Sequence, residues 1–135
     1  MSPIRRFPAA PVSVADARRF ALAALGATGQ EDRERVELMV SELAANCVVH
    51  AATEFDVSVS RSAGFVRVEV TDAGDGEPAV RWPDRLQPKG RGLQIVSSLA
   101  DDWGVHPSMD GAPGKTVWFT LELAESSASQ SRSRG

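Results

Sequence analysis

The sequence has little cysteine, no excess of positive charge and no long hydrophobic run. The single cysteine, Cys47, excludes an internal disulfide framework and a multi-cysteine metal site, and it is typical of a reducing, cytoplasmic setting. A formal net charge of −3 gives no general positive field, so we expect no direct binding to nucleic acid. The longest apolar runs fall short of the roughly 18 residues of a membrane span, and we expect no membrane association.

The length favours one domain. With 135 residues, the chain is long enough to bury one hydrophobic core and hardly long enough for two. Residues 125–135 are rich in serine and arginine and are predicted to form a disordered tail. The predicted organisation is therefore a domain over residues 1–124 followed by that tail.

Hydrophobic periodicity predicts helices and strands in a mixed order. Helical spacing covers residues 14–25, with Ser13 as its N-cap, residues 30–51, and a segment from about residue 92. Period-two alternation covers 55–60, 66–70, 102–109 and 115–123, and residues 5–14 form an extended entry or an edge strand. This order predicts an α+β two-layer sandwich, in which three helices cover one face of a mostly antiparallel mixed sheet.

The helix predicted over residues 30–51 carries a polar row beside its apolar line. Val36, Val40, Leu43 and Cys47 recur at helical spacing and form the predicted buried line. Glu42, Asn46 and His50 are spaced at i, i+4 and i+8, so we expect them on one flank at the border with solvent. Such a row is either an ordinary polar flank or a surface that meets a ligand.

Glycines follow the strand predicted over residues 66–70. Asp72 closes this strand, and its carboxylate could accept a hydrogen bond from an exocyclic amine. Gly74 and Gly76 have no Cβ, so a flat ring could approach the backbone there. The alternative reading of this stretch is a glycine-rich turn.

Two further short motifs have both a functional and a structural reading. "KGRGLQIV" places Lys89, Gly90, Arg91 and Gly92 at a helix start, where free N–H groups attract anions, although Gly-x-Gly often marks only a helix start. "GKTVWF" opens the last predicted strand, and its Thr116 either makes a functional hydrogen bond or merely suits a strand.

The order and spacing of these motifs resemble the Bergerat-fold ATP-binding family. "ELAANCVVH" looks like its N box, "DAGDGEP" and "GRGLQIV" look like its two glycine boxes, and "GKTVWFTL" looks like its closing strand. The start "FPAAPVSVADARRFALAAL" is similar to the small anti-sigma-factor serine/threonine kinases. The resemblance covers about residues 5–123.

The resemblance implies a role for each matching residue. Asn46 would hold Mg²⁺ that bridges the phosphates of ATP, and Glu42 would be the general base for a serine hydroxyl of a partner protein. Asp72 would accept the adenine amino group, and Gly74 and Gly76 would let the base pack closely.

The remaining positions would surround the phosphates and the base. Gly90, Arg91, Gly92 and Leu93 would hold phosphates through backbone N–H groups, with Lys89 beside them. Thr116 would complete the adenine pocket. His50 would either reach a phosphate or serve packing.

The implied function is an ATP-dependent serine/threonine kinase, cytoplasmic and homodimeric, that acts on a STAS-type antagonist protein, sequesters a sigma factor, or does both. A nucleotide-binding module that acts by partner binding alone is the alternative, and a general ATPase is the least favoured. Residues 77–89 would form a short ATP lid, and no phosphoacceptor helix is recognised. Val49 stands where arginine or another polar residue is common in the family, which puts the catalytic activity in doubt.

Overall fold

Alternating apolar residues and helical apolar stripes produce the elements of the fold. The computed structural model describes residues 2–74, 91–107 and 113–123, and the remaining residues lie outside the description. The elements are β1 (Ile4–Phe7), α1 (Val12–Leu25), α2 (Gln30–Asn46), the π-helical turn η1 (Cys47–Ala51), β2 (Phe55–Ser62), β3 (Phe65–Asp72), α4 (Arg91–Leu99), β4 (Asp102–Pro107) and β5 (Lys115–Glu122).

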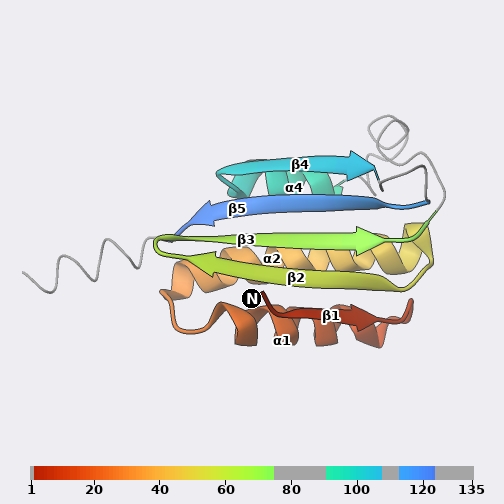
Figure 1. Ribbon diagram of the computed structural model, residues 1–135, viewed down its shortest axis with the longest axis horizontal. Coiled ribbons are helices and arrows are strands. Elements are labelled where there is room, and N and C mark those ends of the chain that lie inside the picture. Colours follow the sequence, from red (N-terminus) through yellow and green to blue (C-terminus); the bar gives the residue numbers. More distant parts are fainter. Residues whose placement is uncertain (1, 75–90, 108–112, 124–135) are drawn as a thin grey trace, which may run out of the picture.

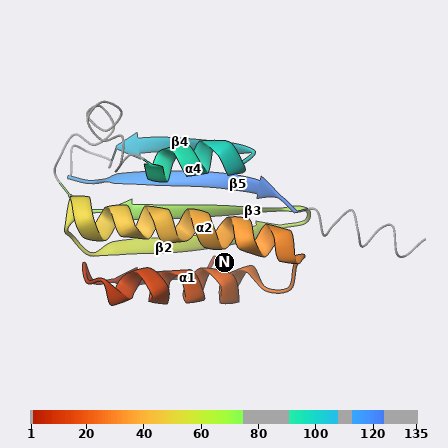
Figure 2. The same ribbon diagram turned by 180° about the vertical axis from the view of Figure 1, so that it is seen from behind.

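The five described strands form one sheet in the order β1-β2-β3-β5-β4. Each of the four pairings is antiparallel, so the sheet is more regular than the mixed sheet expected from the sequence. The three described α-helices lie behind the sheet in Figure 1 and in front of it in Figure 2, and therefore cover one face. The predicted α+β two-layer sandwich is confirmed, and β1 takes the predicted place at an edge.

The core lies between the helix layer and the inner face of the sheet. The apolar line predicted on α2 is buried, with exposed fractions of 5% or less. Opposite it, alternate residues of the central strands point inward, since side chains of a strand alternate between its two faces. The inward residues of β3 and β5 include Val66, Val68, Val70, Val117, Phe119 and Leu121.

Two local predictions are wrong in detail. Helix α1 begins at Val12 after Pro11, and no side chain caps it, so Ser13 is a buried residue of the first turn rather than the N-cap. Proline suits a helix start because its φ is already helical and its missing N–H is not needed there. Strands β2 and β3 are longer than the predicted segments 55–60 and 66–70, because their pairing extends to Ser62 and Phe65 and leaves a turn of two residues, the second being Gly64 with φ 91°.

Candidate functional site

Several elements end or begin at the same edge of the sandwich. Strand β3 ends there at Asp72 and β5 begins there at Lys115. Figures 1 and 2 place the end of α2, the turn η1 and the start of α4 at the same edge. The sequence motifs that lie in these segments are thus brought together, although 43 residues separate Asp72 from Lys115.

A buried ion pair forms at this edge between β3 and β5. Asp72 and Lys115 are direct partners in the antiparallel register, and both side chains point toward the helix layer. The Nζ atom of Lys115 lies 2.5 Å from Oδ2 of Asp72, and the two side chains are 9% and 3% exposed. Charged side chains are rarely buried this deeply unless they are paired, so the pair accounts for the burial of both.

The second oxygen of Asp72 is held by the backbone that follows it. Oδ1 accepts a hydrogen bond from the N–H of Gly74 at 3.0 Å. A carboxylate offers about four acceptor sites, so the two oxygens of Asp72 retain acceptor capacity beyond these two hydrogen bonds. The orientation of the carboxylate is therefore set by a strand partner on one side and by a turn on the other.

Glycines permit close backbone contacts around Asp72. A Cβ on Gly74 would lie 3.1 Å from Cβ of Ala51, so the segment after β3 packs directly on the turn that follows α2. Gly114 has φ 111°, and a Cβ there would lie 2.2 Å from the carbonyl oxygen of Asp72. Only glycine combines this backbone conformation with this approach, and the start of β5 is fixed against the end of β3 as a result.

The helix that carries the polar row does not continue regularly to Ala51. It is α-helical to Asn46, and the next five residues form η1, which ends at Ala52 in a left-handed conformation with φ 55°. Glu42 and Asn46 are half-buried on α2, whereas His50 is exposed in η1. A π turn inserts extra chain into a helix, so the straight row predicted from i, i+4, i+8 spacing is correct only as far as Asn46.

Cys47 lies in η1 beside the ion pair and is a free, buried cysteine. The pKa of its thiol is raised to about 12, mainly by burial and also by the negative charge of Asp72, while the positive charge of Lys115 acts in the opposite direction. The thiol is therefore protonated at neutral pH and acts as a small apolar group. The packing of Gly74 against Ala51 places the end of η1 next to the segment that follows Asp72.

Thr116 is not brought to the same face as Asp72. Its hydroxyl lies 2.8 Å from that of Thr71, on the face of the sheet that the helices leave uncovered. Lys115 is the residue of "GKTVWF" that faces Asp72, and sequence reasoning did not select it. The alternation of β5 contained the signal, because Lys115 is two residues before the buried Val117 and therefore shares its face.

The second glycine motif is described only in part. Arg91 and Gly92 form the first turn of α4, and Leu93 packs against the hydrophobic core. The N–H groups of a first helical turn have no partner within the helix and attract negative charge. Gly76, Lys89 and Gly90 lie outside the described residues, as does the predicted lid over 77–89, and their roles stay predictions.

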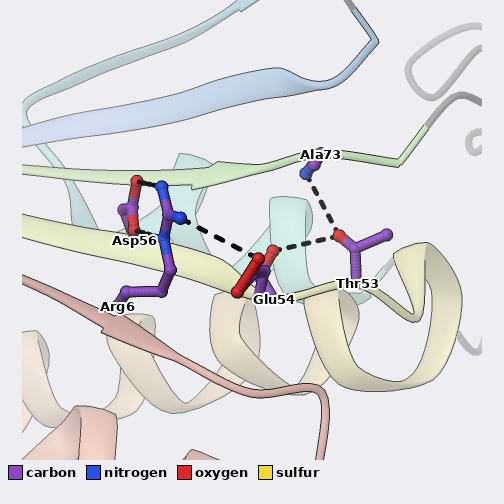
Figure 3. Close-up of polar contacts among 5 residues, drawn as sticks. All are labelled: Arg6, Thr53, Glu54, Asp56 and Ala73. Carbon is purple, nitrogen blue, oxygen red and sulfur yellow. Dashed lines mark hydrogen bonds and ion pairs between the residues drawn. The ribbon is translucent and has the colours of Figure 1, made fainter.

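A network of polar contacts supports the outer side of this edge. Figure 3 shows Arg6 of β1 beside Asp56 and Glu54, with Nε of Arg6 2.9 Å from Oδ1 of Asp56. The hydrogen bond to Asp56 raises the pKa of the Arg6 guanidinium. The hydroxyl of Thr53 accepts a hydrogen bond from the N–H of Ala73, the residue between Asp72 and Gly74. The segment after η1 thereby helps to position the end of β3.

A cavity of about 250 Å³ adjoins this network, and Thr71, Asp72 and Ala73 are among its lining residues. Among the described residues, no three His, Cys, Asp or Glu side chains gather closely enough to hold a metal ion. In the same part of the chain, none of the helices is long and apolar enough to cross a membrane.

Comparisons with known proteins give a family and two similar folds. No curated protein matches the chain. A solved structure of the RsbU and RsbW domains of Rv1364c from Mycobacterium tuberculosis has a TM-score of 0.64 at 22% identity, and the match covers 90% of this chain and 32% of that one.

A histidine kinase domain from the Erythrobacter litoralis EL346 blue-light activated histidine kinase has a TM-score of 0.56 at 24% identity, over 90% of this chain and 64% of that one. The match thus spans about a third of the first solved chain and just under two thirds of the second. At these levels of identity, the similarity shows a shared fold and nothing more. Residues 7–121 match the histidine kinase-like ATPase domain, and the chain belongs to that family.

Proposed function

We propose that this protein binds Mg²⁺-ATP at the edge where β3 ends and transfers the γ-phosphate to a serine of a small antagonist protein of the STAS type. Sequestration of a sigma factor by the same protein, as a homodimer in the cytoplasm, belongs to this proposal. The family membership supports ATP as the ligand. The observation that carries the proposal is the buried Asp72 carboxylate, which lies beside the residues that follow Asn46 and at the same edge as the start of α4.

The described residues fit a nucleotide in three respects. Asp72 has acceptor capacity left for an exocyclic amine. Gly74 packs its backbone against Ala51, which holds the segment after β3, and with it the Asp72 carboxylate, against η1. The first turn of α4 supplies N–H groups of the kind that bind phosphates. Thr116 is better placed to support β5 through Thr71 than to contact the base with its own side chain.

Residues of α2 would bind Mg²⁺ and promote transfer of the phosphate. Mg²⁺ takes few protein ligands and keeps several waters, so the amide oxygen of Asn46 is a sufficient protein contribution when phosphates supply the others. Glu42 lies one helical turn before Asn46 on the same flank and is half-buried. A carboxylate there would orient the attacking serine hydroxyl and accept its proton. His50 is exposed in η1, where either a phosphate contact or a packing role is open to it.

Glu42→Gln tests the kinase function, because it removes the base and keeps the shape of the side chain. We expect loss of phosphate transfer by about 100-fold or more with little change in ATP affinity, as is typical for general-base catalysis. The assay follows transfer of labelled phosphate to a candidate antagonist protein, with ATP binding measured in parallel. Asn46→Ala is the matched variant, and it should weaken binding of Mg²⁺-ATP.

The alternative function is a nucleotide-binding module without significant kinase activity. The exposed Val49, with 66% of its surface accessible, favours it, because an apolar residue stands in η1 where the family commonly has a polar one. Under this alternative, Glu42→Gln would leave control of the partner unchanged. Equal partner binding by the wild type and the variant, with no phosphate transfer by either, would therefore decide against the kinase.

A further inference from the structure

The Asp72–Lys115 pair places an acceptor and a positive charge side by side where the proposed function requires a base to be recognised. The carboxylate and the ammonium group are in hydrogen-bonding contact and are almost completely buried. Their register across β3 and β5 and the close packing of Gly114 leave little freedom to separate them. A nucleotide base bound by Asp72 would therefore lie within a few ångströms of the Lys115 ammonium group, about the length of a hydrogen bond beyond the carboxylate.

Purine bases differ in what their six-position offers to such a pair. In adenine, the 6-amino group is a donor, and the neighbouring ring nitrogen N1 is an acceptor. In guanine and hypoxanthine, the 6-oxo group is an acceptor and N1 carries a proton. A lone carboxylate suits the amino group and repels the oxo oxygen, because two acceptors cannot share a hydrogen bond.

We propose that Lys115 is a specificity-determining residue that lets the Asp72 site accept 6-oxopurine nucleotides as well as adenine nucleotides. With a 6-oxopurine, Asp72 accepts the N1–H bond and the positive charge of Lys115 attracts the oxo oxygen. With adenine, Asp72 accepts a hydrogen bond from the amino group and Lys115 lies toward the acceptor N1, so the two kinds of base meet the fixed pair in orientations turned over relative to each other. The inference rests on the proposed nucleotide binding, and it adds an acceptance of 6-oxopurines that Asp72 alone would not produce.

A purely structural role for Lys115 predicts a different pattern of nucleotide affinities. If the lysine only neutralised Asp72, its removal would affect all nucleotides alike, because the same pocket would be loosened for each. A base-selecting role changes the ratio of two affinities. ITP and ATP are the sharpest pair of probes, because ITP carries the 6-oxo group without the additional 2-amino group of GTP.

The test measures the dissociation constants of ATP and ITP with Mg²⁺ by titration calorimetry. For the wild type, we expect the two constants to agree within about 10-fold. In Lys115→Met, which keeps the length of the chain and removes the charge, we expect ITP to weaken by about 10- to 100-fold relative to ATP, the range for loss of a charge-assisted hydrogen bond. Lys115→Arg keeps the charge and should keep the wild-type ratio.

Arg67→Met is the matched control, because it removes one positive charge from β3 on the uncovered face, where Arg67 lies over the ring of Trp118 at 4.2 Å. It should leave the ratio unchanged. A wild type that binds ATP but discriminates against ITP by more than about 100-fold would overturn the inference and leave the proposed function standing. So would an equal change of both affinities in Lys115→Met. A folded wild type that binds neither nucleotide would overturn the proposed function itself.

Discussion

The two ends of the β3–β5 pairing reverse the usual placement of charged and apolar side chains. At one end, Asp72 and Lys115 face each other in the interior. At the other end, Phe65 is 44% exposed and is paired with the exposed Glu122. An ion pair that is buried costs desolvation, and apolar residues of similar volume often serve stability as well or better. Stability alone therefore does not account for the charged end, whereas the proposed nucleotide site would.

The largest effect on the free energy of unfolding is expected in the middle of the β3–β5 ladder, and a much smaller one at its exposed end. Phe119 is fully buried, and Phe119→Ala should lower the free energy of unfolding by about 3–5 kcal/mol because it leaves a cavity. Phe65→Ala should cost less than about 1 kcal/mol, because that ring is already partly in water. Urea titration followed by circular dichroism measures both. Similar costs at the two positions would contradict the described difference in burial.

A double-mutant cycle on Asp72 and Lys115 should show strong coupling. Asp72→Asn or Lys115→Met alone leaves one buried charge without the opposite charge beside it, and we expect each to cost about 3 kcal/mol. The double variant removes both charges and should cost clearly less than the sum of the two. Additive costs in urea titrations would show that the pair contributes no mutual stabilisation.

The close approach of Gly114 to Asp72 predicts a smaller but definite cost. Gly114→Ala adds a Cβ that would collide with the carbonyl oxygen of Asp72, at a residue whose φ is 111°. We expect a loss of about 2 kcal/mol in unfolding free energy, since both strain and displacement of the strand ends contribute. Gly29→Ala is the matched control, because nothing lies within 4 Å of a Cβ at that position and its φ is −66°. Equal costs for the two variants would refute the proposed contact.

The smallest expected effect on the free energy of unfolding comes from Cys47, and this effect depends on pH. Burial raises the pKa of its thiol in the folded protein to about 12, whereas the ordinary value is 9.0. The unfolded protein loses this proton first, so the stabilisation is present below pH 9 and is lost as the pH rises from 9 to 12. Between pH 8 and pH 10 the wild type should lose about 1 kcal/mol more than Cys47→Ala, as compared by urea midpoints. Parallel pH profiles for the two proteins would exclude this titration.

Much of the fold follows directly from periodicity. The alternation in 55–60, 66–70 and 115–123 predicted β2, β3 and β5, and the line from Val36 to Cys47 predicted the buried side of α2. These segments are predictable because burial of one face fixes which residues are apolar. The first helix ends at Leu25 as predicted, and Gly26 follows it with φ 78° and an N–H bonded to the carbonyl of Leu22.

The departures arise where tertiary contacts override local pattern. Nothing in "NCVVHA" indicates a π turn, because residues that suit an α-helix also suit the insertion that lets Ala51 pack on Gly74. The identity of the residue facing Asp72 depends on strand register, and the motif-based choice of Thr116 took no account of it. The catalytic and binding roles of Glu42, Asn46 and His50 stay predictions, since a side-chain position alone does not identify a ligand.

The position of Asp72 and Lys115 has a consequence for how a ligand would act on the whole domain. Strands β3 and β5 are hydrogen-bonded on both sides, so neither can fray away from the sheet without breaking two ladders. A molecule that contacts both strands at their shared end binds the folded chain and not the unfolded one, so it stabilises the central sheet as a unit. Occupancy should therefore appear as a higher melting temperature of the entire domain and as slower amide exchange throughout the two strands, rather than as protection of a single loop.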